Sequence, residues 1–468
     1  MAASVLLCGA GDAAHRQAQL SLYASLFSFP FLCAMSMPTD ARKAANELIS
    51  FIDASPSPWH AVASAEQGLL AQGFTRLEEG ERWQLAAAGR YYTVRGGASL
   101  IAFVLGSRVP AETGYRIVGA HTDSPGLRLK PRAALAGDGL LRLGVEVYGG
   151  PILATFADRD LSLAGRVVMR AASGPQTRLL RFEQPLLRLP NLAIHMNREV
   201  NEQGLKFNKQ TELPLILGQL AEGADAEVRL RTLLAEAVQG DAADLLSWEL
   251  AVHDAQKGCL WGADQEFIAS RQLDNLASCH AAIAALMATE QPAATCIAAL
   301  FDHEEVGSES AAGAGGSFVS DVLARVGLQA GLDAEDSLRA LARSFFISAD
   351  MAHAWNPNFP AAYEPEHKVQ VNAGPVIKTN ANQRYSTGAE TAARFMDLCA
   401  QAGVPCQQYS HRSDLGCGST IGPIVAARLG IASVDVGSPM WAMHSARESA
   451  GAHDHAWMIA ALAAAYAS

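Results

Sequence analysis

Two kinds of strand pattern alternate along this chain, and their order constrains the fold more than any other feature. Uninterrupted apolar runs such as 115–120 (YRIVGA) and 295–301 (TCIAALF) are typical of strands buried on both faces of a sheet. Helical patterns such as 274–288 separate these runs, as the crossovers of a parallel or mixed sheet require. Between about residues 128 and 265 the sequence pattern is instead typical of β-strands. We therefore expect an α/β domain interrupted by a β-rich insertion.

Three segments with strand patterns indicate the insertion. Residues 141–150 (LRLGVEVYGG) alternate apolar and polar side chains, which indicates a half-buried strand. Residues 160–170 (DLSLAGRVVMR) predict a hairpin around Ala164-Gly165, and 245–254 (LLSWELAVHD) predict another strand. A chain of 468 residues is too long to fold around one simple hydrophobic core. We expect the α/β domain to comprise 37–127 and 266–468, with the insertion at 128–265.

The charge balance limits the classes of partner. The chain holds 36 Lys and Arg against 47 Asp and Glu, a net charge of −11. An acidic surface gains nothing from a polyanion, so we expect neither nucleic acid nor a membrane surface as the main partner. No stretch reaches the roughly 18 to 20 uninterrupted apolar residues that a membrane-spanning helix needs.

The first 36 residues precede the first helical pattern, which begins near Thr39. Their apolar stretch at 22–35 is broken by Pro30, and a weak positive region precedes it. We expect a non-native or disordered extension that adds little to the fold. A secretory signal is the alternative.

The eight cysteines are scattered and form no C-x-x-C pair. This usage favours free thiols in a reducing, cytoplasmic compartment. A disulfide between Cys399 and Cys406 is the alternative.

Histidine and acidic residues gather where the predicted strands end. Because open α/β sheets collect their functional groups at the carboxyl ends of strands, these side chains are expected to meet. Four positions follow buried strands and a fifth opens the helix at 274–288. They are His121, the run 302–305 (DHEE), Asp350, His444 and, before the helix, Asp274.

Two histidines and three carboxylates, one of them able to bridge, form a ligand set that suits a pair of zinc, manganese or cobalt ions. The adjacent Glu304 and Glu305 can divide the work, because consecutive side chains diverge. One coordinates metal, and the other faces the bound water as general base. Asp123 can accept a hydrogen bond from the far nitrogen of His121 and fix its orientation.

Each of these residues taken singly has an ordinary explanation. Asp274 before a helix would serve as an N-cap, and Glu304-Glu305 would serve as an exposed loop pair. The joint placement of five such residues at strand ends is what favours a metal centre.

Around these residues, six motifs in order resemble the M18 metallopeptidase family, and within it the aspartyl aminopeptidases and their bacterial relatives. The resemblance covers the chain from about residue 40 onward. The motifs are GAHTDSPGLRLKP (119–131), SRQLDNLAS (270–278), FDHEEVGSES (301–310), SADMAHAWNPN (348–358), VIKTNANQRYS (376–386) and MHSARE (443–448).

The resemblance implies a zinc-peptidase α/β/α sandwich interrupted by a β-rich dimerisation domain, with two Zn²⁺ per subunit and Mn²⁺ or Co²⁺ as possible substitutes. His121 and Asp350 match the ligands of the first zinc, and Glu305 and His444 match those of the second. Asp274 matches the bridging carboxylate. Glu304 matches the general base, which takes a proton from the water and later delivers it to the leaving amine.

The resemblance also implies substrate-binding roles for His353, Lys378 and Tyr385, together with Glu304. Lys378 is the natural partner of a substrate β- or γ-carboxylate, and the phenol of Tyr385 could hydrogen-bond the substrate carbonyl. A solvated loop lysine is the alternative for Lys378.

His195 lies in the insertion, far in sequence from every ligand. In the family the equivalent histidine reaches the active site of a neighbouring subunit, and twelve subunits assemble from dimers. The resemblance therefore implies a homo-oligomer, a dimer-based dodecamer. Taken by itself, His195 would be an ordinary core or surface residue.

The function implied is that of a dinuclear zinc aminopeptidase that removes N-terminal Asp or Glu from peptides, with a metal-activated water and Glu304 as base. A metallo-aminopeptidase of the same architecture that prefers neutral residues is one alternative. A non-catalytic scaffold on a peptidase fold is another, and it predicts missing ligands or a missing base.

Overall fold

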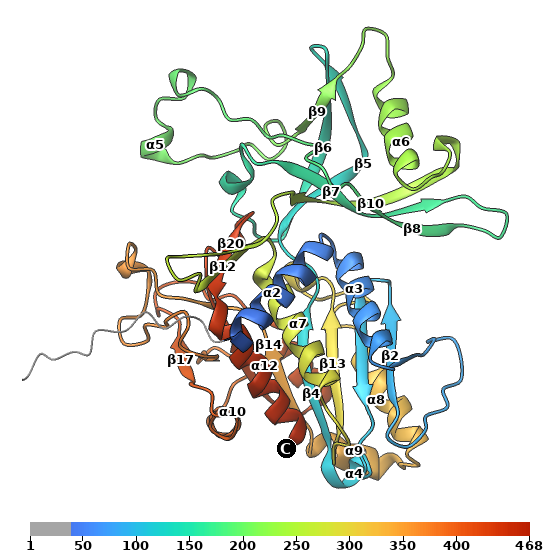
Figure 1. The fold of residues 1–468 in the computed structure, drawn as a ribbon, viewed down its shortest axis with the longest axis vertical. Coiled ribbons are helices and arrows are strands. Elements are labelled where there is room, and N and C mark those ends of the chain that lie inside the picture. Colours follow the sequence, from blue (N-terminus) through green and yellow to red (C-terminus); the bar gives the residue numbers. More distant parts are fainter. Residues whose placement is uncertain (1–38) are drawn as a thin grey trace, which may run out of the picture.

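The computed structural model describes residues 39–468, so the expectation for residues 1–36 lies outside the described part. Figure 1 shows two parts, a larger α/β part and a smaller β-rich part stacked on one end of it. The chain leaves the larger part after β4 (Tyr115–His121) and returns to it after β10 (Leu245–Asp254). The fold is the α/β domain with a β-rich insertion that the strand patterns predict, arranged as the sandwich that the family resemblance implies.

The larger part is built on a mixed sheet, which has nine strands within residues 39–468. In spatial order the strands are β1 (Thr75–Arg76), β2 (Arg90–Arg95), β3 (Ser99–Val104), β13 (Thr295–Phe301), β4, β14 (Phe345–Ala349), β18 (Ala432–Gly437), β16 (Val376–Thr379) and β17 (Gln407–Ser410). The central strands β13, β4, β14 and β18 run parallel to one another. On one side β3 pairs antiparallel with both β13 and β2, and on the other β16 pairs antiparallel with β18.

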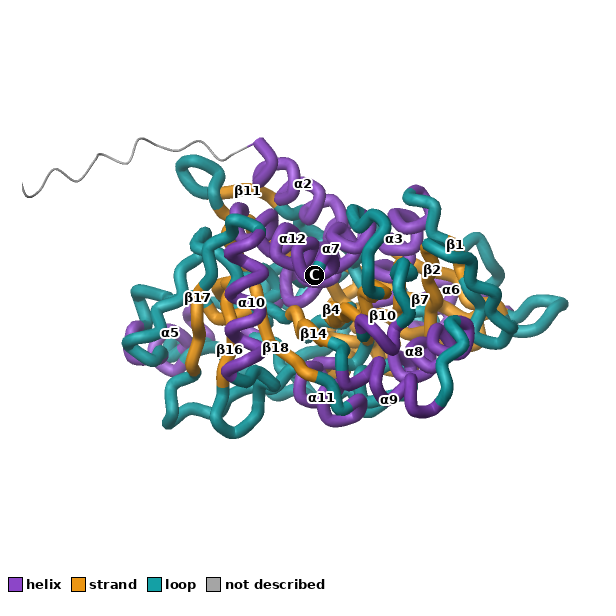
Figure 2. Tube along the Cα trace, turned by 90° about the horizontal axis from the view of Figure 1, so that it is seen from below, coloured by secondary structure: helices purple, strands orange, loops and turns teal. Residues whose placement is uncertain are grey.

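Helices cover both faces of this sheet, as Figure 2 shows along its edge. One layer holds α2 (Thr39–Ala54), α3 (Pro58–Ala71), α7 (Leu273–Met287), α10 (Ala389–Gln401) and α12 (Ala452–Ala467). The other layer holds α8 (Phe318–Gln329), α9 (Ala334–Ala342) and α11 (Ile421–Leu429), with the short α4 (Pro110–Thr113) beside α9.

The central strands are apolar throughout because both of their faces are covered. In β4, Val118 packs into the core under α7 and α12, whereas its neighbour Ile117 packs into the core under α8 and α11. Alternation of side chains across a strand sends successive residues to opposite faces. Uninterrupted apolar runs are therefore the correct sequence signature for this sheet.

The inserted part is an antiparallel sheet, with six strands in the described chain, packed against α6 (Ala226–Ala237). Leu230 and Leu234 of α6 are fully buried in its core together with Leu127 and Leu143. In spatial order the strands are β8 (Gln176–Arg181), β7 (Leu161–Met169), β10, β5 (Gly126–Gly137), β6 (Leu140–Tyr148) and β9 (Leu215–Gln219). Short helices in its connections are η1 (Leu153–Phe156), η2 (Ile194–Met196), α5 (Val200–Gln203) and η3 (Ala242–Asp244).

The predicted hairpin at Ala164-Gly165 is wrong, because β7 runs unbroken from Leu161 to Met169. Gly165 pairs with Leu250 of β10, and a Cβ atom at Gly165 would lie 2.1 Å from the carbonyl oxygen of Glu249. The glycine therefore permits a close approach of two strands rather than a turn.

A third sheet consists, in the described residues, of five short strands, and Figure 1 shows two of them, β12 and β20, at the end of the larger part that faces the insertion. Its first strand, β11 (Cys259–Trp261), falls inside the range expected for the insertion, yet it pairs with β12 (Phe267–Ser270), which belongs to the larger part. The other strands are β20 (Glu448–Gly451), β19 (Pro439–Trp441) and β15 (Ala352–His353). The last strand of the inserted sheet itself is β10, which ends at Asp254.

The cysteines in residues 39–468 are free, including Cys399 and Cys406, so the alternative disulfide is not formed. Within the same residues, no helix has both the length and the apolar character needed to cross a membrane.

Candidate metal centre

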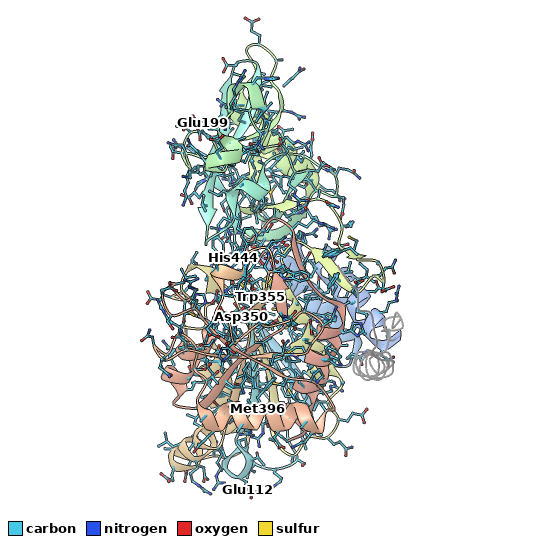
Figure 3. The ribbon with its side chains drawn as sticks, turned by 90° about the vertical axis from the view of Figure 1, so that its left-hand side faces the viewer. Glu112, Glu199, Asp350, Trp355, Met396 and His444 are labelled. Atoms are coloured by element: carbon cyan, nitrogen blue, oxygen red, sulfur yellow. The ribbon has the colours of Figure 1, made fainter. Side chains whose placement is uncertain are left out.

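The first ligand candidates sit at the carboxyl ends of two adjacent parallel strands. His121 is the last residue of β4, and Asp350 directly follows β14. Because β4 and β14 pair in parallel, both side chains reach the same edge of the sheet, where His121 Nε2 lies 3.5 Å from Asp350 Oδ1. His121 is 1% exposed. Figure 3 shows Asp350 and His444 near the end of the larger part that faces the insertion.

Asp274 lies at the start of α7, between the two histidines. Its Oδ1 is 3.6 Å from His121 Nε2, and its Oδ2 is 3.2 Å from His444 Nε2. Asp274 is 2% exposed, and its Oδ1 finds no hydrogen-bond partner among the described residues. One carboxylate therefore presents an oxygen to each histidine.

Glu305 completes the second side of the cluster. It belongs to the short helix η4 (Glu304–Val306), and its Oε1 lies 3.4 Å from His444 Nε2. One ligand atom each of His121, Asp274 and Glu305 can be chosen so that all three lie within 4.8 Å of one another. The five predicted ligands thus fall into two sets, one around each histidine, that share Asp274.

The pKa values of the cluster show uncompensated negative charge. Burial raises the pKa of Glu305 well above its usual value, and Asp274 adds to the rise. The pKa of Asp274 is raised by burial and by Asp350. Burial by itself would lower the pKa of His121 and of His444, but nearby carboxylates outweigh it, raising that of His121 well above its usual value and that of His444 to about 9.

A divalent cation bound in the cluster would reduce this electrostatic repulsion directly. It competes with the protons that the histidines would otherwise hold, and it neutralises carboxylates that repel one another. The unpartnered Oδ1 of Asp274 is a ready ligand atom. The donor set of imidazole nitrogen and carboxylate oxygen suits zinc, manganese or cobalt. The residues present therefore fit such ions.

Glu304 lies beside the cluster, with its Oε2 3.9 Å from His121 Nε2. Burial, reinforced by the carboxylates of Asp350 and Asp123, raises the pKa of Glu304 to about 8. A carboxyl group with such a pKa can exchange a proton near neutral pH. This geometry is compatible with the role of general base.

Asp123 contacts His121 through its backbone carbonyl and not, as we expected, through its carboxylate. The Nδ1–H of His121 donates to the backbone carbonyl of Asp123 at 2.9 Å, whereas the carboxylate Oδ1 is 3.4 Å away. The carboxylate accepts instead from the backbone N–H groups of Glu304 and Glu305, each at 3.1 Å, and from the Tyr148 hydroxyl at 2.7 Å. Asp123 therefore orients His121 through its main chain and fixes the Glu304–Glu305 turn through its side chain.

Three further residues support the cluster and were not predicted from the sequence: two contact ligand candidates directly, and the third contacts Asp123. Glu448 is buried, and its two oxygens accept from the backbone N–H groups of Asp274 at 3.1 Å and His444 at 2.7 Å. The carbonyl of Gly150 accepts from His444 Nδ1 at 3.0 Å, and Tyr148 holds Asp123. Glu448 ends the motif MHSARE, so its position was visible, but its partners were not.

The cluster opens into a cavity of about 340 Å³. His353, Lys378 and Tyr385 line it together with all five ligand candidates and Glu304. Lys378 is only 2% exposed, so it is not a solvated loop lysine. Its Nζ donates to the carbonyl of Asp350 at 3.1 Å, to the carboxylate of Asp350 at 3.3 Å and to the carbonyl of Met351 at 3.1 Å.

Two electrostatic features distinguish the part of the cavity that His353 and Lys378 line. Burial, helped by the charge of Lys378, lowers the pKa of His353 to about 4, so His353 is neutral. The Lys378 ammonium also lies 5.1 Å from the centre of the Tyr385 ring. The cavity thus joins a buried cation and neutral polar groups to the acidic cluster.

His195 does not reach this cavity within its own chain. It lies in η2 on the insertion and is exposed, flanked by the exposed apolar residues Ile194 and Met196. Of the predicted site residues, it is the one that the fold of a single chain leaves outside.

A family model described as "Aminopeptidase I zinc metalloprotease (M18)" matches residues 51–466. Fold, cluster and match together define a zinc metalloprotease. The chain belongs to the M18 family of zinc aminopeptidases.

Individual relatives agree with this assignment. A "Probable M18 family aminopeptidase 2" of Pseudomonas paraeruginosa is 50% identical over 426 residues, which is 90% of this chain and 97% of that protein. The cryo-EM structure of the Ape4 and Nbr1 complex contains a chain with a TM-score of 0.88 and 36% identity, covering 91% of this chain and 86% of that one. The Saccharomyces cerevisiae mApe1 dodecamer gives a TM-score of 0.78 and 27% identity, covering 90% and 95%.

Proposed function

We propose that this chain is a dinuclear zinc aminopeptidase that hydrolyses the N-terminal residue, preferentially Asp or Glu, from peptides. The observation that carries the proposal is the pair of ligand sets sharing Asp274, with Glu304 beside them. One ion would lie with His121 and Asp350, and the other with His444 and Glu305. Mn²⁺ or Co²⁺ could replace zinc, because the same donors suit them.

Two bound ions would polarise the scissile carbonyl and lower the pKa of the attacking water. Glu304 takes a proton from that water and delivers it to the nitrogen of the departing peptide. Burial raises the pKa of Glu304 to about 8 and so favours its protonated form. Nearby positive charge lowers the pKa of a carboxyl group, so the ions would favour the form that accepts a proton.

Lys378 supports the preference for acidic residues. It is a buried cation on the wall of the cavity, where a substrate carboxylate would be shielded from water and the attraction strengthened. Tyr385 and the neutral His353 line the same cavity and would hydrogen-bond the substrate.

One specific observation favours a second candidate, an aminopeptidase with neutral preference. All three donors of the Lys378 ammonium are engaged, two with Asp350 and one with Met351. A substrate carboxylate would have to displace one of these acceptors. If it does not, Lys378 serves to position Asp350 rather than to select the substrate.

The oligomeric state is part of the proposal. The mApe1 neighbour is a dodecamer, and exposed Leu192, Ile194 and Met196 surround His195 on the insertion. We infer a homo-oligomer, a dimer-based dodecamer, in which the insertion contacts a second subunit and His195 enters that subunit's site. Free cysteines support a cytoplasmic location.

The test is hydrolysis of Asp-, Glu-, Leu- and Lys-anilides by the purified protein, before and after chelation and after addition of zinc. We expect chelator-sensitive cleavage, restored by zinc, and fastest for Asp or Glu. Faster cleavage of Leu would establish the neutral preference. Absence of chelator-sensitive cleavage of every substrate would support the scaffold alternative.

A further inference from the structure

A second cavity adjoins the one that holds the cluster. It has a volume of about 570 Å³, and Gly307 and Ile424 line both cavities. Glu309, Ser310 and Arg428 line the second cavity alone. The two cavities are therefore neighbours, and the second lies beside the Gly307 and Ile424 wall of the first.

The chemistry of the cluster fixes which part of a peptide would lie toward the second cavity. Under the proposed function, Glu304 gives its proton to the nitrogen of the departing peptide, so that nitrogen lies next to Glu304. Gly307 directly follows η4, the short helix that carries Glu304. Lys378, by contrast, lies on β16 and contacts Asp350. The N-terminal residue therefore lies toward Lys378, and the departing peptide lies toward Gly307.

The second cavity is lined by the guanidinium group of Arg428, which forms no ion pair with any residue of the described range 39–468. Arg428 is exposed in the last turn of α11, and among residues 39–468 no carboxylate lies within 4.0 Å of it. A guanidinium group binds carboxylates through two parallel hydrogen bonds. The acidic residue on the same wall, Glu309, forms no ion pair with it within that distance.

We propose that the second cavity binds the departing part of the peptide and that Arg428 binds a carboxylate of it. The inference rests on the proposed aminopeptidase function and adds a substrate class to it, namely short peptides with a carboxylate downstream of the cleaved bond. That carboxylate is either the C-terminus of a short peptide or an acidic side chain.

Arg428 also has a purely structural explanation, because a cation in the last turn of a helix interacts favourably with the helix dipole. The experiment must therefore separate recognition from stability. Arg343 provides a matched control, since it is also an exposed arginine at the C-terminal end of a helix, α9, and lines neither cavity.

The experiment measures kcat/KM of the full-length, zinc-loaded enzyme for substrates that share one N-terminal residue and differ only after it. The series is the anilide, Xaa-Ala, Xaa-Ala-Ala and Xaa-Ala-Ala-Ala as free acids, their C-terminal amides, and Xaa-Ala-Asp-amide, where Xaa is the residue that the enzyme cleaves fastest. Because Xaa is chosen in this way, a failed Asp preference leaves the test intact. No cleavage of any anilide would refute the proposed function instead.

We expect Arg428→Gln to lower kcat/KM about tenfold for at least one free-acid peptide while leaving the anilide and the amides within twofold of wild type. A loss confined to free acids identifies the C-terminus as the ligand, and a loss on Xaa-Ala-Asp-amide identifies an acidic side chain. Arg343→Gln should change nothing.

Two results overturn the proposal. One is an equal loss on every substrate, anilide included, and the other is no loss on any peptide. If Arg428→Gln does not fold, Glu309→Gln replaces it, because removing an acid from the same wall should raise the ratio of free-acid to amide cleavage. An unchanged ratio in that variant would also contradict the proposal.

Discussion

The Nδ1–H of His444 donates to the carbonyl oxygen of Gly150 at 3.0 Å. His444 follows β19 in the catalytic part, whereas Gly150 follows β6 of the inserted sheet. The bond fixes the tautomer that leaves Nε2 free to face Asp274 and Glu305. Gly149 brings the same loop close, since it has a φ of +67° and a Cβ atom there would lie 3.1 Å from the Cβ of Glu305. The insertion therefore helps to position the residues of the candidate metal centre.

Glu448→Gln should weaken zinc binding about 10- to 100-fold, the range for partners that orient metal ligands. Glu448 holds the main chain at both Asp274 and His444, and an amide offers one acceptor where the carboxylate offers two. Competition titration with a zinc chelator measures the effect, with exposed Glu390→Gln as control. Unchanged affinity would show that the two backbone contacts do not position the ligands.

Glu304→Gln should retain fold and zinc but lower kcat by about 10² to 10⁴, the usual contribution of a general base. The amide occupies the same space and cannot take a proton from water. Steady-state kinetics and zinc content measured on one preparation separate catalysis from metal loss. Exposed Glu236→Gln on α6 is the control. Turnover at the wild-type rate would remove Glu304 from its role.

Lys378→Ala distinguishes two roles for Lys378, selection of acidic substrates and positioning of Asp350. If Lys378 binds the substrate carboxylate, the ratio of Asp to Leu cleavage should fall about 10- to 100-fold, the value of a charge-assisted hydrogen bond. Because Lys378 also donates to Asp350, zinc affinity should fall as well. An equal loss on both substrates with weakened zinc binding would assign Lys378 to positioning alone. Exposed Lys43→Ala is the control.

His253→Asn should reduce the decrease in the free energy of unfolding that occurs as the pH falls. Burial, with help from Arg271, lowers the pKa of His253 to about 3 in the folded chain, against 6.5 when exposed. Below pH 6.5 the unfolded chain gains a proton that the folded chain does not, so stability falls as pH falls through this window. The slope is about 1.4 kcal/mol per pH unit.

The measurement for His253 is urea denaturation of both proteins at pH 5.0, 6.0, 7.0 and 8.0. Asparagine can still donate to the carbonyl of Asp254, as His253 Nδ1 does at 3.1 Å, and it does not titrate. The free-energy difference between the two proteins should therefore move in favour of the variant as pH falls. A difference that is constant with pH would contradict the assignment.

The sequence predicted the elements whose pattern is local. Runs such as 115–120 and 295–301 are apolar because both sheet faces are covered, and β4 and β13 appear at those positions. The ligand candidates could be predicted because each follows such a strand or opens a helix. Parallel pairing then brings His121 and Asp350 to one edge without further information.

The rest depends on contacts between segments far apart in the chain. Gly165 looked like a turn because its partner, the carbonyl of Glu249, comes from a distant strand. Gly150 and Tyr148 reach the site only because the inserted sheet is stacked on the catalytic part. Nothing local in the sequence indicated that Asp350 and Met351 would engage all the donors of Lys378.

Titration of the chelated protein with zinc, followed by both binding and hydrolysis of the best anilide, tests the dinuclear centre most directly. We predict that two equivalents per chain bind and that activity reaches its maximum only at the second equivalent. Asp274→Ala, which removes the carboxylate shared by both sets, should abolish tight binding of at least one equivalent and activity with it. Full activity at one equivalent, or undiminished binding of two by Asp274→Ala, would contradict the account.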